Sequence, residues 1–250
     1  MKTITGDLKN GTTSPAPQIE CWIPERENHK GIGLIIFPGG GYGGLAEHEG
    51  KGYAEYFVRH GIACFVVTYR LGSQGFHHPA MLEDALSAIS AVRSSAAAFG
   101  LDPRKIGVMG SSAGGHLTAH SLVAWHKYKN DVSLRPDFGI LCYPVIMSQG
   151  KFAHEGSMIN LLGEHASSAL REEVACEKHV TPETPPCFIW HTGEDDGVPV
   201  ENSIAFASAL RKNGVPFELH VYAKGGHGMG LNTRFTWGLD CVRWMKETTD

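Results

Sequence analysis

The sequence predicts an α/β domain built on a mostly parallel sheet with helices on both faces. Short apolar runs alternate with helix-like stretches along the chain, and most of these runs are apolar on both faces of a strand. The 250 residues are 42% hydrophobic and 19% charged, which is the size and composition of a folded domain. We therefore expect a single domain over residues 1–250.

The expected strands are the apolar runs that are too short for helices. A first strand is expected at Gln18–Ile23. Six more are expected where aliphatic and aromatic residues dominate: Gly31–Phe37, Ile62–Tyr69, Lys105–Met109, Phe138–Tyr143, Cys187–His191 and Phe217–Tyr222.

The stretches between these runs carry apolar residues at helical spacing. A short helix is expected at Gly50–His60, and a long one at Pro79–Phe99, where proline suits the first turn. The others are expected at Ala113–His126, Val200–Lys212 and Thr233–Lys246. The connection at about 146–186 is too long to be a structureless loop, so we expect it to form a small cap over one end of the sheet.

Composition and charge exclude several classes of function. The formal net charge is −4 and no basic stripe appears, which argues against a nucleic-acid partner. No apolar run approaches the roughly 20 residues of a membrane span, so no membrane partner is expected. The first residues lack a signal peptide and the six cysteines are scattered, which favours reduced, mostly buried thiols in a cytoplasmic protein. A mature secreted form is the alternative. The oligomeric state stays open.

Glycine is the compositional outlier, with 31 residues. In a parallel sheet the ligand site lies beyond the carboxyl ends of the strands. Many of the glycines lie in four loops that follow expected strands, which predicts that these loops converge at one end of the sheet.

One of these loops has the pattern of a nucleophile. Gly110-Ser111-Ser112-Ala113-Gly114 reads G-x-S-x-G, with Ser112 at the centre, an apolar strand before it and a helix after it. A sharp turn between strand and helix lifts the serine hydroxyl out of the sheet. A glycine-rich turn that only packs a helix is the alternative, but the strand and helix context favours a nucleophile. Ser111 occupies the x position and is not the expected nucleophile.

A second loop, Pro38-Gly39-Gly40-Gly41-Tyr42-Gly43-Gly44, follows the Gly31–Phe37 strand. A tetrahedral oxyanion needs preorganised N–H donors, and glycine-rich backbone can turn them toward it. The candidate donors are the N–H groups of Gly40, Gly41 and Ala113, the residue after the nucleophile. A phosphate-binding loop would need Gly-Lys-Ser/Thr to follow, and none does.

The acid and the base are expected after the last two strands. Three consecutive acids, Glu194, Asp195 and Asp196, follow Cys187–His191, and chemistry alone does not choose among them. His227 lies in a glycine-rich loop after the last strand, where a general base for Ser112 is expected.

The histidines also offer a competing hypothesis, a zinc site. His116 and His120 have i, i+4 spacing on an expected helix, but no third ligand is evident. We therefore predict no metal and no cofactor. His116 lies one helical turn after Ser112, where support of the site and helix packing are equally plausible roles.

Taken together, the segments GGGYGGLAEHEG, TYRL, HPAMLEDA, VMGSSAGGHLTA, FIWHTGEDDGVPVENS and GGHGMGL resemble those of α/β-hydrolase-fold serine esterases. The nearer likeness is to the acetylxylan-esterase-like branch, also labelled feruloyl-esterase- or endoxylanase-like, and the more distant one is to the hormone-sensitive-lipase group. The family's acid loop, H-T-x-D-D-P-x-V-P, places the acid four residues before a proline. Matched to Pro199, this implies Asp195.

This resemblance implies an α/β-hydrolase fold, with a mostly parallel sheet and a small cap between its sixth and seventh strands. It also implies a carboxylic ester hydrolase with Ser112, His227 and Asp195 as its triad, acting on short acyl groups, such as acetyl, of sugars or xylo-oligosaccharides. Two alternatives stay open. One is another acyl hydrolase on the same site, such as a formamidase, a peptidase or a general short-chain carboxylesterase. The other is a non-catalytic binding protein.

Overall fold

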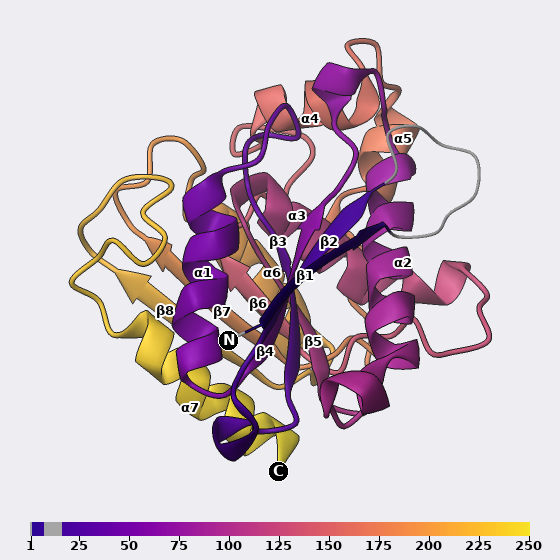
Figure 1. The fold of residues 1–250 in the computed structure, drawn as a ribbon. Helices are drawn as coiled ribbons and strands as arrows, with labels where there is room; N and C mark the ends of the chain where they lie inside the picture. The colour runs from indigo at the N-terminus through magenta and orange to yellow at the C-terminus, as the bar shows by residue number, and fades with distance from the viewer. Residues whose placement is uncertain (1, 8–16) are drawn as a thin grey trace.

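The computed structural model describes residues 2–7 and 17–250, so residues 1 and 8–16 of the predicted domain lie outside the description. The described residues form one sheet with the strand order β1-β2-β4-β3-β5-β6-β7-β8 (Figure 1). β1 and β2 pair antiparallel, as do β2 and β4, and every other neighbouring pair is parallel. The prediction of a mostly parallel sheet flanked by helices is confirmed.

The strands follow the apolar runs closely. Their bounds are β1 Lys2–Asp7, β2 Gln18–Ile23, β3 Gly33–Phe37, β4 Ala63–Thr68, β5 Ile106–Ser111, β6 Gly139–Cys142, β7 Cys187–Thr192 and β8 Phe217–Tyr222. The sequence did not predict β1, whose KTITGD is too polar to read as a buried run. It forms an edge strand, which pairs with a neighbouring strand on one side only.

The main helices are α1 Glu47–Arg59, α2 Ala80–Ser94, α3 Ser112–Ala124, α6 Glu201–Lys212 and α7 Trp237–Thr249. The expected starts and ends differ from these bounds by up to five residues, and only the end of α6 at Lys212 was predicted without error. Pro79 precedes α2 as its N-cap and is not in the first turn. The stretch Ala96–Phe99, expected to continue that helix, is a separate 3₁₀ turn.

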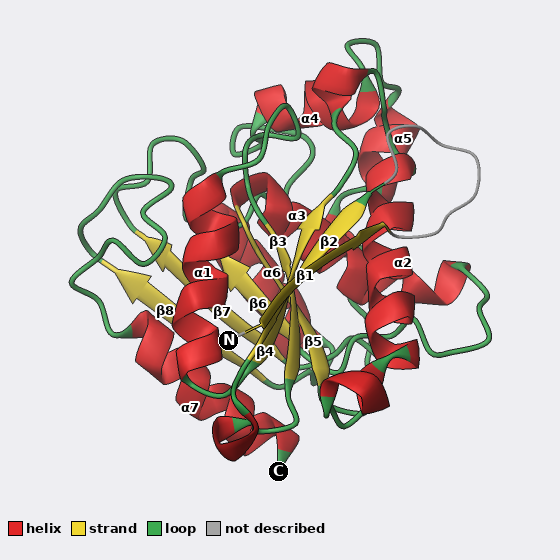
Figure 2. Ribbon diagram, in the orientation of Figure 1, coloured by secondary structure: helices red, strands yellow, loops and turns green. Residues whose placement is uncertain are grey.

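Helices cover the sheet on both sides (Figure 2). α1 and α7 pack on one face, around Tyr53, Phe57 and Trp237. α2, α3 and α6 pack on the other. Every residue of β3, β5, β6 and β7 is buried, whereas β8, at the edge, is partly exposed. No helix in the described part of the chain is long and apolar enough to cross a membrane.

The chain between β6 and β7 contains two short helices, α4 Glu155–Leu162 and α5 Ser168–Glu173, and the 3₁₀ turn Cys176–Lys178. α4 packs against the turn at Gly72–Gln74, which follows β4. The long predicted connection is therefore ordered, and it lies against a loop that leaves the carboxyl end of the sheet.

The strand order also determines where the loops after β3 and β5 lie. The chain leaves β3 toward β4 on one side and leaves β5 toward β6 on the other. The loops that follow β3 and β5 therefore diverge at a topological switch point, where a crevice for a ligand forms in such sheets. These are the glycine loop at 38–44 and the turn at Ser112.

Candidate active site

Ser112 occupies a strained turn between β5 and α3. Its φ is 53°, a left-handed conformation that a serine rarely adopts, and the residue is 7% exposed. Glycine is required on both sides: a Cβ on Gly110 would lie 2.1 Å from the Gly114 carbonyl oxygen, and one on Gly114 would lie 2.0 Å from the Phe37 oxygen. The turn can therefore form only because these neighbours lack side chains.

The preceding serine, Ser111, has a different environment. It is fully buried, and its Oγ lies 2.8 Å from the hydroxyl of Tyr53. Its side chain is thus held inside the protein, which agrees with the expectation that Ser111 is not the nucleophile.

The structure brings Ser112, His227 and Asp195 together, although Ser112 and His227 are 115 residues apart in sequence. Ser112 Oγ lies 2.8 Å from His227 Nε2, and His227 Nδ1 lies 2.7 Å from Asp195 Oδ2. With the His227 proton on Nδ1, that N–H donates to the carboxylate and Nε2 accepts from the serine hydroxyl. This is the geometry of a nucleophile, a general base and an orienting acid.

Asp195 is held in place by the backbone of its own loop. Its Oδ1 accepts the N–H groups of Gly197 at 2.9 Å and Val198 at 2.8 Å. Burial alone would raise the pKa of the Asp195 carboxyl. Hydrogen bonds from His191 and His227, together with that of Val198, outweigh burial and hold this pKa well below its usual range. The carboxylate is therefore ionised at neutral pH.

The other two acids of this loop face solvent. Glu194 is exposed and forms an ion pair with Lys224, and the hydrogen bond from that lysine lowers the pKa of Glu194. Asp196 is exposed. The choice among three acids that chemistry alone left open therefore has a geometric answer, since Asp195 is the one hydrogen-bonded to His227.

The glycine loop after β3 passes directly beside the nucleophile. A Cβ on Gly39 would lie 3.1 Å from the Cβ of Ser112 and 2.7 Å from the Ser111 carbonyl oxygen. Gly40 and Gly41 have φ values of 127° and 64°, which glycine adopts without strain. Such angles turn successive peptide N–H groups in directions that a regular strand does not allow.

In the described part of the chain, one N–H group of this loop is used inside the protein, whereas the next two are free to bind an oxyanion. That of Gly39 donates to Glu49 Oε2 at 2.8 Å, so it is occupied inside the protein. Within residues 17–250, no hydrogen bond of this loop uses the N–H groups of Gly40 and Gly41. The Ala113 N–H lies in the first turn of α3, where helix geometry supplies no acceptor. Within residues 17–250, none of the three predicted donors is therefore occupied by another acceptor.

Helix α4 holds the glycine loop from the other side. The side chain of Asn160 donates to the Gly41 carbonyl oxygen at 2.8 Å, and a Cβ on Gly41 would lie 3.8 Å from Ser157 Oγ. His154 caps the helix by accepting the Ser157 N–H on Nδ1 at 3.1 Å. The segment between β6 and β7 therefore contributes to the geometry of the site.

His116 links the same loop to the chain beyond α5. The hydroxyl of Tyr42 lies 2.7 Å from His116 Nδ1, and His116 Nε2 lies 2.9 Å from the Val174 carbonyl oxygen. A carbonyl only accepts, so the His116 proton is on Nε2 and Tyr42 donates to Nδ1. Burial lowers the pKa of His116 to about 4, so the ring is neutral. Of the two roles considered for His116, it therefore supports the loop that flanks the nucleophile.

Two residues of the site were missed by sequence reasoning. His191, at the end of β7, was read only as part of a strand, although its i, i+4 spacing to Asp195 was a signal. Glu49, in α1, lies just before the helix expected at Gly50–His60 and was given no role. Both side chains are almost completely buried, and both bind polar groups of the site.

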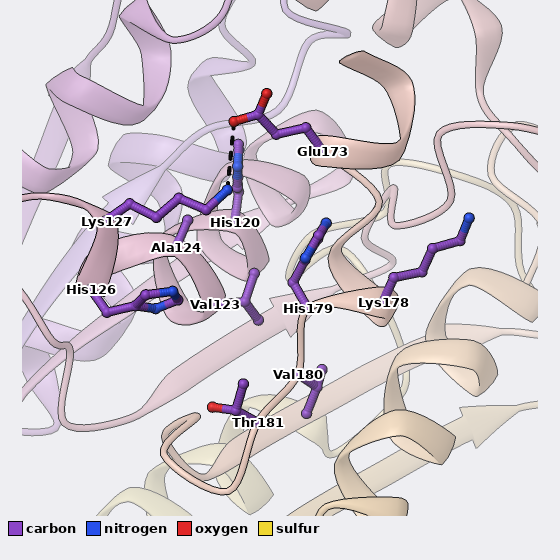
Figure 3. A pocket seen from close by; sticks show the side chains of 10 residues that line it. All are labelled: His120, Val123, Ala124, His126, Lys127, Glu173, Lys178, His179, Val180 and Thr181. Carbon is purple, nitrogen blue, oxygen red and sulfur yellow. Dashed lines mark ion pairs between the residues drawn. The ribbon is translucent and has the colours of Figure 1, made fainter. Parts of the chain in front are cut away.

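The alternative of a zinc site has no support in the described residues. Nowhere among them do three or more histidine, cysteine, aspartate or glutamate side chains come together in a way that could hold a metal ion. His120 instead lines a pocket of about 200 Å³ beside the ion pair of Lys127 and Glu173 (Figure 3). The triad does not line this pocket. All six cysteines are free and buried, as predicted.

Comparison with known proteins agrees with this geometry. The profile of the α/β hydrolase fold matches residues 34–231. The fold is similar to that in the crystal structure of an acetyl ester-xyloside bifunctional hydrolase from Caldicellulosiruptor lactoaceticus, with a TM-score of 0.88. The two sequences are 40% identical, and the match covers 98% of this chain and 96% of that one.

Two curated relatives are similar in sequence. An acetylxylan esterase of Xylanibacter ruminicola is 35% identical over 92% of this chain and 48% of its own length. Endo-1,4-beta-xylanase B of Butyrivibrio fibrisolvens is 38% identical over 86% of this chain and 35% of its own length. The chain thus spans less than half of the length of either relative. The match over most of the chain, together with the fold, shows that the protein belongs to the α/β hydrolase family.

Proposed function

We propose that the protein is a serine carboxylic ester hydrolase that removes short acyl groups, such as acetyl, from sugars or xylo-oligosaccharides. The observation that carries this proposal is the continuous hydrogen-bonded chain from Ser112 through His227 to Asp195. The neighbouring glycine loop contributes the N–H groups of Gly40 and Gly41, which bind no acceptor among residues 17–250. Orientation of a hydroxyl by an imidazole and a carboxylate is the arrangement that acyl transfer needs.

In the first half of the reaction, Ser112 Oγ attacks the acyl carbonyl carbon while His227 Nε2 takes the hydroxyl proton. Asp195 stabilises the imidazolium that forms, because its carboxylate is already ionised and fixed. The carbonyl oxygen becomes an oxyanion, which the N–H groups of Gly40, Gly41 and Ala113 hold. The tetrahedral intermediate then expels the alcohol, which takes the proton from His227.

In the second half, water replaces the alcohol. His227 Nε2 removes a proton from water as its oxygen attacks the acyl-enzyme carbonyl, and the same three N–H groups hold the second oxyanion. Collapse releases the carboxylic acid and returns the proton to Ser112 Oγ. No step requires a metal or an organic cofactor, because the backbone N–H groups supply the electrostatic stabilisation.

The substrate class rests on the names of the relatives. The acetylxylan esterase and the acetyl ester-xyloside hydrolase both have acetyl esters in their names, and the latter matches nearly end to end. A glycosidase would also need two carboxyl groups flanking the scissile bond. At this site Asp195 and Glu49 have their oxygens occupied by internal hydrogen bonds. We therefore expect esterase activity without release of xylose from a xyloside.

The test is hydrolysis of p-nitrophenyl acetate by the wild type, Ser112→Ala and Ser111→Ala. We expect Ser112→Ala to lower kcat by at least about 10³-fold. Ser111→Ala, the adjacent serine whose hydroxyl faces Tyr53, should keep most of the activity. Full activity of Ser112→Ala would overturn the proposed mechanism.

The substrate class is tested separately. Acetate release from acetylated xylo-oligosaccharides is compared with hydrolysis of p-nitrophenyl acetate, an aryl anilide and p-nitrophenyl xyloside. Preference for the acetylated sugars supports the proposal, whereas preference for the anilide assigns the site to amide hydrolysis. If a fluorophosphonate fails to label Ser112, the chain is a binding protein on this fold.

A further inference from the structure

Glu49 is a buried acid whose two carboxylate oxygens contact two different parts of the site, the glycine loop after β3 and Tyr143. It lies in the first turn of α1 and is 3% exposed. A buried carboxylate is costly unless hydrogen-bond donors surround it. Two donors satisfy it: Gly39 N–H at 2.8 Å from Oε2, and the Tyr143 hydroxyl at 2.7 Å from Oε1. The roles assigned to the triad and the oxyanion donors do not use this residue.

The first of these bonds acts on the oxyanion loop. Gly39 follows β3 by two residues and lies against Ser112, since a Cβ added at Gly39 would be 3.1 Å from Ser112 Cβ. Because Glu49 binds the Gly39 N–H, the orientation of that peptide is set from α1. The next two N–H groups, those of Gly40 and Gly41, then remain for the oxyanion.

The second bond reaches the loop that carries His227. Tyr143 donates its hydroxyl proton to Glu49, and the same oxygen accepts the Gly230 N–H at 3.0 Å. The Tyr143 ring also lies edge-on to the His227 ring, with centroids 5.2 Å apart. A Glu49–Tyr143–Gly230 chain therefore connects α1 to the backbone three residues after the general base.

Two further features support this connection. Tyr143 has a φ of 35°, an unfavourable conformation that persists only where the surrounding structure holds it. The neighbour of Glu49, His48, is exposed, and its Nε2 lies 2.9 Å from the Gly228 carbonyl oxygen. The first turn of α1 thus holds the His227 loop at two points.

We propose that Glu49 is a positioning residue that aligns the oxyanion loop and the His227 loop with Ser112 at the same time. This inference rests on the proposed ester hydrolysis. Glu49 touches neither the substrate nor the reacting atoms. It acts through Gly39 on the N–H donors and through Tyr143 on the general base. Both groups act most strongly in the transition state, so loss of Glu49 should lower kcat more than it changes KM.

The experiment measures kcat and KM for p-nitrophenyl acetate, the rate of fluorophosphonate labelling and the melting temperature of full-length Glu49→Ala and Glu49→Gln. We expect Glu49→Ala to lower kcat about 100-fold, comparable to loss of an oxyanion donor, with KM within about 3-fold of the wild type. Glu49→Gln should lower kcat about 10-fold, because its amide oxygen can still accept the Gly39 N–H.

Asp137→Asn is the matched control. Asp137 is also an acid that accepts a backbone N–H, that of Ile106 at 2.8 Å, and it pairs with Arg93 at 2.7 Å. It lies at the opposite end of β5 from Ser112. This variant should melt at a lower temperature than the wild type and keep its kcat and labelling rate. This outcome would show that a loss of stability does not by itself produce the fall in kcat expected for the Glu49 variants.

A folded Glu49→Ala with kcat within about 3-fold of the wild type would overturn the inference. If Glu49→Ala does not fold, the decision passes to Glu49→Gln, for which an unchanged kcat would overturn it. A fall in kcat that Asp137→Asn matches at equal loss of melting temperature would also overturn it. Failure of the proposed function looks different: there the wild type itself hydrolyses no ester.

Discussion

The imidazole of His191 lies 3.3 Å from Asp195, at the same Oδ2 atom that accepts the His227 N–H. His191 Nε2 is also 2.8 Å from the Val198 carbonyl oxygen, and its Nδ1 is 2.7 Å from Ser203 Oγ. The carbonyl can only accept, so the proton is on Nε2 and points toward both oxygens. One carboxylate oxygen thus faces two histidines, a buried one in a strand and a partly exposed one in a loop.

His191→Ala should lower kcat for p-nitrophenyl acetate about 10-fold, because Asp195 loses a partner that fixes its orientation toward His227. The matched control is His220→Ala, on the adjacent strand β8, where the ring pairs with Glu218. Steady-state kinetics compare the two. Equal kcat values in both variants would mean that His191 only fills space.

Asp195→Asn should lower kcat about 10³- to 10⁴-fold, because an amide can neither stabilise the imidazolium nor hold the same histidine tautomer. Asp196→Asn and Glu194→Gln should stay within about 2-fold, because both side chains are exposed. Rates of p-nitrophenyl acetate hydrolysis under saturating substrate check the ranking. A severe Asp196→Asn defect would move the acid to that residue.

Gly39→Ala should lower both activity and stability. Its Cβ would lie 2.4 Å from Glu49 Oε2 and 2.7 Å from the Ser111 carbonyl oxygen, so the loop would have to move away from Ser112. We expect a loss of about 1–3 kcal/mol in the free energy of unfolding, as for an overpacked core site. Urea denaturation and kinetics measure the two effects.

The control in the same loop is Gly44→Ala, where an added Cβ meets nothing within 4 Å and φ is not positive. This variant should be close to the wild type in both measurements. A large defect at Gly44 would show that the loop needs flexibility in general and not close approach at Gly39.

His116 makes stability depend on pH in a defined window. Its pKa is about 4 in the folded protein, because of burial, against 6.5 ordinarily. As pH falls from 6.5 to 4 the unfolded chain binds the proton first, so folding stability decreases with falling pH and levels off below about 4. The full contribution is about 3 kcal/mol.

Urea unfolding from about pH 4 to about pH 8 tests this effect in the wild type and in His116→Gln. The variant should lose less stability toward the acid end of this range. His78 and His120, whose pKa values are also lowered by burial, act in the same direction and will leave part of the slope. Parallel curves for the two proteins would contradict the prediction.

Most of the fold could be predicted from the sequence, because buried parallel strands are apolar on both faces. The strand that was missed, β1, pairs with β2 alone and reads as polar. The helix ends were placed less accurately than the helices themselves, since Pro79 and the 3₁₀ turn at Ala96–Phe99 depend on packing at the helix ends. Local pattern therefore identified the elements better than their limits.

Ser112 and His227 could be identified as candidates without a structure, because a strained turn and a glycine-rich loop are properties of a few consecutive residues. The choice of Asp195 was implied by the family resemblance, and the fold gives its geometric reason, since Asp195 is the acid that contacts His227. Two other features emerged from the folded arrangement alone: Gly39 donates to Glu49 while Gly40 and Gly41 do not, and His191 contacts the acid. Those features depend on the relative positions of loops from different strands. Hydrogen bonds require distances of about 3 Å, and no local pattern encodes a distance between residues far apart in the chain.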